Sequence, residues 1–405
     1  MSISGVRSIG ELAQQGALEF GDGYRTKRSE HAASGYRIIR VADVNGGAIQ
    51  LGSPDFVSQA FERSIGGKAG RPGDILLTTK GTVGRVAIVP ELHEAIVYSP
   101  QLCYFRVYDA EVIDPRYLSL WFRSDEFVHQ ASHRMNNTDM AAYINLADIR
   151  SLILRLPDLD EQRAIAEVLG ALDDKIAVNT KFARLSLEIS SAIFQSHVRR
   201  IARSASTFSD LAKISGGGTP STKVPEFWAG DINWATPSDV TALAGPYLRS
   251  TSRRISDEGL QACSSSLFQP GAILMTSRAT IGAFAIAQTA TAVNQGFIVV
   301  EPIHEYMRYW LFHEMHSRVD EFLSLANGAT FLELSRGNFK KLPVRLAEPE
   351  VLNSFAEVAG SLHSSAAAAH RENETLAEIH DALLSQLMSG KLRVRDAEIA
   401  VEAVV

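Results

Sequence analysis

Residues 71–89 read RPGDILLTTKGTVGRVAIV, and residues 269–287 read QPGAILMTSRATIGAFAIA. The two stretches align without a gap at an offset of 198 residues. Each contains Pro-Gly, continues as an apolar run typical of a buried strand, and then turns at Gly or Ala. A repeat of this length predicts that the chain contains two copies of one mixed α and β unit.

The repeat extends outward on both sides of this stretch. Upstream, Asp43-Val44 aligns with Asp239-Val240. Downstream, Ile165-Ala166-Glu167-Val168 aligns with Phe355-Ala356-Glu357-Val358 at an offset of 190 residues. The repeating unit is therefore a globular segment followed by a helical segment.

Apolar residues spaced three or four apart predict two long amphipathic helices, one from about Glu161 and one ending at Gly390. A helix of about 38 residues is on the order of 57 Å long. We expect the two apolar seams to pair as an antiparallel coiled coil. If so, the amides of Asn179 and Asn373 can meet; the alternative is that either amide points to solvent. The predicted seam residues are Leu172, Ile176, Asn179, Ile189, Leu362, Asn373, Leu376 and Leu383.

The predicted fold class is α+β, with two mixed α/β domains in tandem, each followed by a long helix, and with pseudo-twofold symmetry. The globular domains are expected at residues 1–157 and 204–346, and the helical segments at 158–203 and 347–392. Residues 393–405 are expected to form an acidic tail.

Composition narrows the class of protein. With 45% hydrophobic and 21% charged residues, the chain has enough apolar material for packed cores. The net charge of -6 arises entirely in residues 346–405, which hold 4 basic and 10 acidic residues, so charge alone neither favours nor excludes DNA binding. Two cysteines and no apolar segment long enough for a membrane helix predict a cytoplasmic protein without a disulfide framework.

Three further stretches carry a family resemblance. They are GGGTPSTKVPEFWAGDINWATPSDV (216–240), VNQGF (293–297) and LRLPDLDEQRAIAEVLGALDDKI (154–176). Together with the order domain, helix, domain, helix, they resemble the specificity subunit of type I restriction-modification systems. The first domain departs from this pattern, because it has GDGYRTKRSE and YSPQLCYF where the second has the glycine-rich loop and VNQGF.

The resemblance implies a non-catalytic subunit in which two target-recognition domains each read one half of a bipartite site in double-stranded DNA. It implies that the helices set the spacing and dock methyltransferase subunits, usually two, and that a restriction subunit can join. S-adenosylmethionine would be bound by the methyltransferase, so no cofactor is expected in this chain.

Cations at matching turns are the first candidates for DNA contacts. Lys80 and Arg278 follow equivalent strands, and a cation there can hold a phosphate or a guanine edge. The alternative is a solvated turn residue or a structural ion pair. Basic, glycine-rich and asparagine-containing loops complete the set, which is Arg25, Lys27, Arg28, Thr79, Lys80, Arg134, Asn136, Asn137, Thr219, Ser221, Lys223, Ser277, Arg278 and Asn327.

Rival chemistries lack their motifs. The chain has no Asn-Pro dipeptide, as an adenine methyltransferase would need, and no GxxxxGK[ST] loop for nucleotides. The pairs His129/His133 and His313/His316 lack the glutamate of a zinc HExxH motif, so we expect no metal site and no catalytic residue. A coiled-coil scaffold that assembles partners without reading DNA is the main alternative, and a metal-dependent nuclease is a third.

Overall fold

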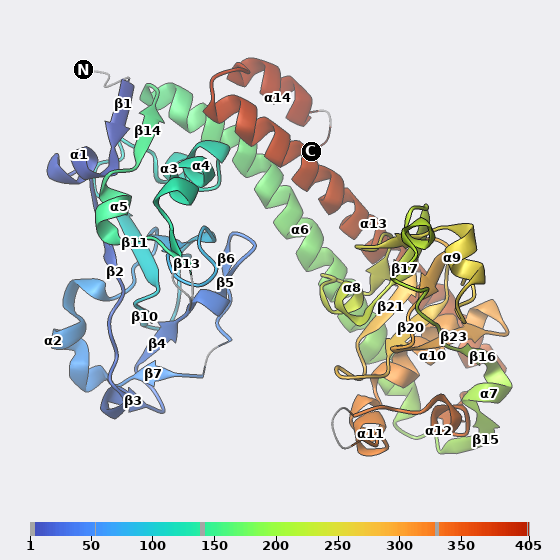
Figure 1. Cartoon of the computed structure of the whole chain (residues 1–405). Helices are drawn as coiled ribbons and strands as arrows, with labels where there is room; N and C mark the ends of the chain where they lie inside the picture. Colours follow the sequence, from blue (N-terminus) through green and yellow to red (C-terminus); the bar gives the residue numbers. More distant parts are fainter. Residues whose placement is uncertain (1–4, 53, 138–141, 329–331, 403, 405) are drawn as a thin grey trace. The chain divides into compact units, whose positions relative to one another are not determined.

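The computed structural model describes residues 5–52, 54–137, 142–328, 332–402 and 404. The chain divides into two compact units, one of residues 1–175 with 375–405 and one of residues 176–374 (Figure 1). The boundaries fall inside the two long helices, α6 (Leu159–Val198) and α13 (Pro349–Met388), so part of each helix belongs to each unit.

The first domain is built on two sheets. One has the order β2 (Leu18–Asp22), β11 (Leu102–Val107), β8 (Ile75–Thr78), β9 (Val86–Ile88), with antiparallel neighbours throughout. The other has the order β10 (Ile96–Tyr98), β4 (Tyr36–Ile39), β7 (Phe56–Val57), β3 (His31–Ala32), and its β10–β4 pair is parallel. Its larger helices are α1 (Ile9–Gln14), α3 (Pro115–Trp121), α4 (Asp125–Arg134) and α5 (Leu146–Arg150).

The second domain repeats this topology. Its larger sheet has the order β16 (Ala212–Ser215), β23 (Phe297–Pro302), β20 (Ile273–Thr276), β21 (Phe284–Ala287), followed by β18 (Tyr247–Leu248). Its smaller sheet joins β19 (Arg254–Ile255), β17 (Ile232–Ala235) and β22 (Thr291–Val293), again with one parallel pair. The strands predicted from the aligned stretches are β8 and β20, at the same place in each sheet. The predicted repeat is therefore confirmed at the level of topology.

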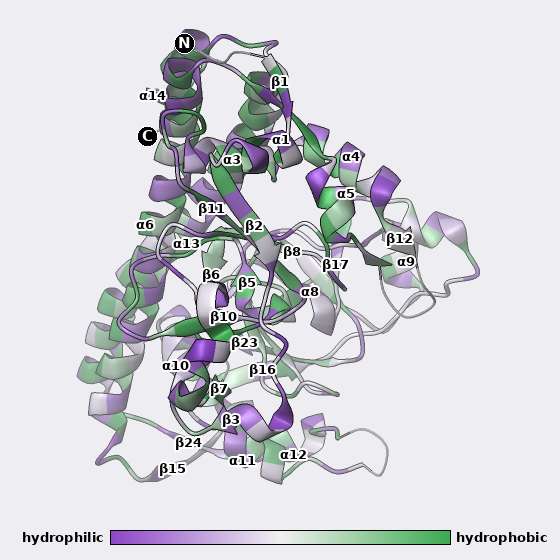
Figure 2. Ribbon diagram, turned by 90° about the vertical axis from the view of Figure 1, so that its left-hand side faces the viewer, coloured by the Kyte–Doolittle hydropathy of each residue, from purple (hydrophilic) through white to green (hydrophobic). Residues whose placement is uncertain are grey.

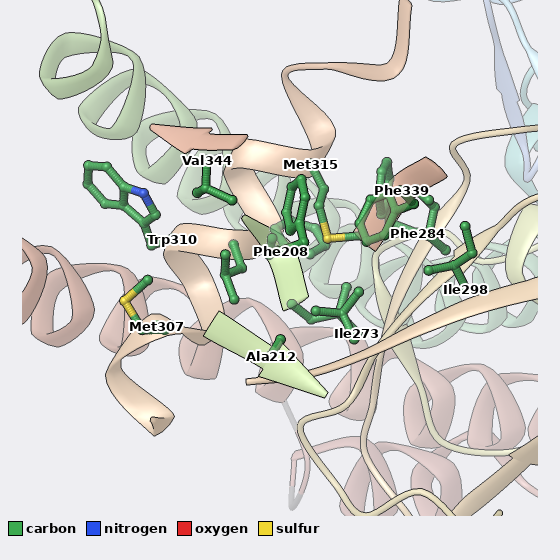
Figure 3. Packing of buried hydrophobic residues seen from close by; sticks show 14 of the residues in the cluster. Phe208, Ala212, Ile273, Phe284, Ile298, Met307, Trp310, Met315, Phe339 and Val344 are labelled. Atoms are coloured by element: carbon green, nitrogen blue, oxygen red, sulfur yellow. The ribbon is translucent and has the colours of Figure 1, made fainter. Parts of the chain in front are cut away.

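The core of the second domain lies between its larger sheet and helices α10 (Arg308–His316), α11 (Val319–Ser324) and α12 (Arg336–Lys340). Figure 3 shows Trp310, Met315, Phe208 and Phe339 within this cluster. The one polar atom of Trp310 is satisfied, because its indole N–H donates to the carbonyl oxygen of Arg345 over 2.7 Å.

Each domain is closed by a two-stranded sheet at its ends. In the first domain β1 (Gly5–Ser8) pairs antiparallel with β14 (Ile153–Leu156). In the second, β15 (Arg203–Thr207) pairs antiparallel with β24 (Pro343–Arg345). The strand that enters each domain therefore lies beside the strand that leaves it.

The two long helices begin and end where the sequence signals indicate. The side chain of Asp158 accepts a hydrogen bond from the Glu161 backbone N–H at the start of α6, and α13 starts with Pro349, a residue suited to the first turn. The second helix ends before Gly390, which has a φ of 69° and so adopts the left-handed conformation of a helix stop.

Within each unit the helix halves run antiparallel, as predicted. In the second unit the amide of Asn179 donates to Glu372 over 2.9 Å, and that of Asn373 donates to the carbonyl of Ile176 and the hydroxyl of Thr180. Each amide thus bonds across to the other helix. In the first unit, Leu172, Leu376 and Leu383 are buried as expected.

The predicted seam is wrong for the C-terminal half of α6. Ile189 is 50% exposed, and Leu362 on α13 is only half-buried. The buried positions are one residue further on, at Ala183, Ser186, Ser190 and Phe194. Ala183 packs with Ala366 and Ala369 of α13 and with Tyr247 of β18, so small residues let the helices approach closely while the large ones face outward. Figure 2 shows hydrophobic residues recurring along α6.

A hydrogen-bonded chain of side chains ties both helices to the second domain. His313 Nε2 lies 2.8 Å from the hydroxyl of Ser190 and 3.1 Å from His363 Nε2, and His363 Nδ1 lies 3.0 Å from the hydroxyl of Tyr247. Both imidazoles are buried. Burial lowers the pKa of His313 to about 3, with a further contribution from His363, and burial lowers the pKa of His363 to about 4. Both imidazoles are therefore neutral at physiological pH.

The C-terminal segment, predicted as an acidic tail, contains a helix. Residues Val394–Glu402 form helix α14, in which Ala397 and Val401 are buried. Its apolar residues four apart fit one packed face of a helix. Across the part of the chain that the structure describes, none of the helices combines the length and apolar character that a bilayer crossing requires.

Candidate nucleic-acid interface

The turns after β8 and β20 have one backbone conformation. Gly81 has a φ of 82°, and Ala279, its counterpart in the second domain, has a φ of 59°. Gly84 and Gly282 also match, with φ of 99° and 87°. A left-handed alanine costs on the order of 1 kcal/mol, so the second domain keeps this turn despite strain. We call residues 79–84 and 277–282 the cationic turns, after Lys80 and Arg278.

Each cationic turn is fixed by a later segment of its own domain. In the first domain Lys80 forms a bridge with Tyr143, and the Gly81 N–H donates to the carbonyl of Ala142 over 3.0 Å. In the second, Arg278 forms a bridge with Glu333. The two cations are thus held by the same kind of backbone pairing.

In the first domain Lys80 lies between two hollows. One, of about 450 Å³, is lined by Arg25, Thr79 and Lys80 among others, so the structure brings three predicted residues together. The larger, of about 740 Å³, is lined by Lys80 with Arg40 and Arg85. Thr79 is buried and its hydroxyl donates to the carbonyl of Gln101 over 2.9 Å, so it supports the turn.

The other predicted residues of the first domain lie outside these hollows. Lys27 and Arg28 are exposed on the neighbouring loop. Arg134, at the end of α4, donates to the hydroxyl of Ser151 and to the carbonyl of Gln130. Asn136 and Asn137 form strand β12, which pairs with β13 (Ala142–Tyr143), and their side chains lie outside the described part of the structure.

In the second domain the cationic turn lines a hollow of about 330 Å³. The guanidinium of Arg278 forms an ion pair of 2.9 Å with Glu333, whose backbone also pairs with Asn327. The hydroxyl of Thr219 lies 2.6 Å from Gln295 Oε1. The hollow is lined by Gly216, Gly217, Ser277, Arg278, Gln295, Phe297, Glu333, Leu334, Ser335, Arg336 and Gly337.

The remaining predicted residues of this domain lie beside its tryptophans. Ser221 and Lys223 are exposed, and the carbonyl of Ser221 accepts a hydrogen bond from the Trp228 indole. Trp234 is buried in the core. The guanidinium of Arg253 lies 3.5 Å from the ring centre of Trp228, a cation–π contact that holds this arginine on the surface of the domain.

Several residues that line these hollows are not among those predicted from the sequence. Arg85 could have been found, because it is a charged residue where the aligned position of the second domain is Ala283. Gln295 lies in the VNQGF stretch, which carries the family resemblance but did not predict that this side chain lines the hollow. Glu333 and Arg336 had no signal, because they reach Arg278 and the glycine-rich loop through tertiary folding.

A row of large apolar side chains lies exposed on α6. Val178, Phe182, Leu185 and Ile189 are 63%, 49%, 39% and 50% exposed. Their spacing of four, three and four residues places them on one face of the helix. We call this row the outer stripe. Contiguous exposed apolar residues of this kind mark protein–protein contact sites.

The histidine pair predicted on one helical face is in contact. His129 and His133 on α4 have their Nε2 atoms 3.3 Å apart. Across the described residues, no group of three or more His, Cys, Asp or Glu side chains is arranged to hold a metal ion.

Comparison with known proteins gives the family. The type I restriction modification DNA specificity domain matches residues 4–184 and again residues 205–350. The MjaIX specificity subunit of Methanocaldococcus jannaschii is 35% identical over 175 residues, which cover 42% of this chain and 40% of that subunit. The HindI specificity subunit of Haemophilus influenzae is 22% identical over 408 residues, covering 80% of this chain and 88% of that subunit.

A solved structure supports the fold. The S subunit of a type I restriction-modification system from M. genitalium superposes with a TM-score of 0.57 at 12% identity, covering 95% of this chain and 96% of that one. The match of the family description to both repeats, in the order found in the structure, leads to one conclusion: the chain belongs to the specificity-subunit family of type I restriction-modification systems.

Proposed function

We propose that the chain supplies DNA sequence specificity to a type I restriction-modification complex, and that each domain reads one half of a bipartite site. The observation that carries the proposal is the pair of cationic turns. Two domains of one chain hold a cation on the same left-handed turn, after the same strand, beside a hollow. Cations beside hollows are suited to phosphate oxygens and guanine edges.

The helices are proposed to dock methyltransferase subunits, two of them by the resemblance. The outer stripe of α6 supports this part of the proposal, because four large apolar side chains face solvent while smaller residues face the partner helix. S-adenosylmethionine is proposed to bind to the methyltransferase, and a restriction subunit is proposed to join the same complex.

The test of the proposal is methylation sequencing of DNA after co-expression of the chain with its neighbouring methyltransferase. We expect adenine methylation at one split motif, present only when this chain is present. A stable complex that methylates no motif would favour the scaffold function instead.

The cationic turns can be tested in the same experiment. We expect Lys80→Ala and Arg278→Ala each to weaken DNA binding by about tenfold, since a contact to a charged group contributes roughly 1.4 kcal/mol or more. Binding is measured by fluorescence anisotropy on the identified site, and co-purification of the methyltransferase is the control. Unchanged affinity in both variants would remove the turns from the interface.

A further inference from the structure

The larger hollow of the first domain holds positive charge that the fold does not neutralise. Arg85 is half-buried, and its guanidinium lies 3.5 Å from the carbonyl oxygen of Val44. Among the described residues, neither Arg85 nor Lys80 forms an ion pair with a carboxylate. Burying part of a guanidinium without a counter-charge is unfavourable unless a ligand supplies one.

The hollow carries no acidic side chain among its described lining residues. Arg40 is the third cation, and it is already neutralised by Asp55 over 2.5 Å. The other polar lining residues are Thr26, Thr82, Ser99 and Gln101. The buried hydroxyl of Ser99 has no hydrogen-bond partner among the described residues.

The second domain has no equivalent of this charge. Ala283 stands where the first domain has Arg85, and Arg278 is paired with Glu333 at 2.9 Å. The hollow beside Arg278 corresponds to the hollow of about 450 Å³ in the first domain, and its lining includes both Glu333 and Arg336. The two copies therefore share a turn but differ in charge.

We propose that Lys80 and Arg85 together bind a phosphodiester group of the DNA backbone in the hollow of the first domain. The inference rests on the proposed function and assigns one phosphate contact to the first domain. The first domain then supplies salt-dependent affinity through free cations. In the second domain the aligned cation, Arg278, is paired with Glu333, so Arg278 itself is expected to release fewer counterions than Lys80.

This division of roles is measurable as a salt slope. Neutralising one phosphate contributes about 0.9 to the slope of log K against log salt concentration on duplex DNA. The probe is a fluorescent mixed-sequence duplex titrated with the full-length chain at several salt concentrations. Because both cations contact one phosphate, we expect Arg85→Gln and Lys80→Gln each to reduce the slope in part, and the double variant to reduce it by about 0.9 in all.

Matched variants exclude indirect effects. Arg85→Lys keeps the positive charge and is expected to keep the wild-type slope. A variant that failed to fold would not keep it, so this variant shows whether the effect of Arg85→Gln is due to charge. Arg278→Gln combined with Glu333→Gln removes the ion pair of the second domain without changing net charge, and this pair of changes is expected to leave the slope unchanged. Thermal unfolding of each variant checks that the domain is intact.

The outcomes separate the inference from the proposed function. If Arg85→Gln and Lys80→Gln both keep the wild-type slope while a split motif is still methylated, the hollow is not a phosphate site and the proposed function survives. If the slope falls only when Arg278 and Glu333 are both changed to Gln, the phosphate contact lies in the second domain and the inference is overturned. If the wild-type chain binds no duplex and directs no methylation, both fail.

Discussion

At the scale of single residues, the cationic turns show what alignment reveals and what it hides. The alignment placed Lys80 and Arg278 at equivalent positions, and the structure gives them equivalent backbones. It did not reveal that Glu333 pairs with Arg278, because that residue lies 55 positions later in the chain and reaches the turn only through folding. Local pattern predicts backbone conformation; it does not predict which charge is left free.

The strain at Ala279 leads to a stability prediction. Ala279→Gly is expected to raise the free energy of unfolding by roughly 0.5–1 kcal/mol. Glycine adopts a positive φ without the steric penalty of alanine, and this gain is partly offset by the greater backbone entropy of glycine in the unfolded state. Urea denaturation measures the change. Ala229→Gly is the matched control, because Ala229 has a φ of -107°. Glycine relieves no strain there, so this variant is expected to have a lower free energy of unfolding than the wild type. Destabilisation by Ala279→Gly would contradict the assigned strain.

At the scale of elements, the helices were predicted in extent but not in orientation. Two rows of residues on α6 could have faced α13. One row contains Phe182, Leu185 and Ile189, and the other lies one residue further on, which is about 100° around the helix. Hydrophobicity favours the first as the buried one, yet the structure buries the second, with Ser186 and Ser190. The choice depends on Ala366 and Ala369 of α13 and on Tyr247, which pack against Ala183. A sequence pattern cannot show which of two faces has a partner within the same chain.

The outer stripe makes a prediction about assembly. Phe182→Ser combined with Ile189→Ser is expected to weaken binding of the methyltransferase at least tenfold and to leave the chain folded, because both side chains are about half exposed. Isothermal titration calorimetry measures the affinity. Val128→Ser, at an exposed apolar residue of α4, is the control and should bind normally. Normal binding by the double variant would place the docking surface elsewhere.

The chain of buried histidines makes a prediction about pH. Below about pH 6.5 His313 and His363 become protonated in the unfolded state but stay neutral in the folded state. The free energy of unfolding therefore falls as the pH falls towards 4. At pH 5 the loss is up to about 2 kcal/mol for each histidine. Denaturant titrations at pH 7 and pH 5 measure it. His363→Gln should flatten this dependence, whereas the exposed His93→Gln should keep it; equal slopes would contradict the assignment.

At the scale of the whole molecule, the sequence predicted the order of domains and helices because the repeat is long and its strands are strongly apolar. It predicted less well where only packing decides. Residues 393–405 were expected to be an acidic tail, yet Ala397 and Val401 bury one face of a helix. The hollows could not be predicted, because each is lined by residues from segments far apart in the chain.

The proposed role of the helices as a spacer can be tested by shortening them. Deleting one heptad around Asn179 and the facing heptad around Asn373 removes about 10 Å from each helix. We expect the gap between the two halves of the methylated motif to shorten by about three base pairs. Methylation sequencing reads the gap directly. A motif with the original gap would show that the helices do not set it.

The pairing of β1 with β14 and of β15 with β24 bears on how such a protein changes over time. Each domain begins and ends on adjacent strands, so it behaves as a cassette whose two junctions lie side by side. A recombination event that replaces the segment between the two junctions would exchange one target-recognition domain for another and leave the helices unchanged. New specificities can therefore arise in a single genetic step, without the gradual remodelling that a continuous interface would demand.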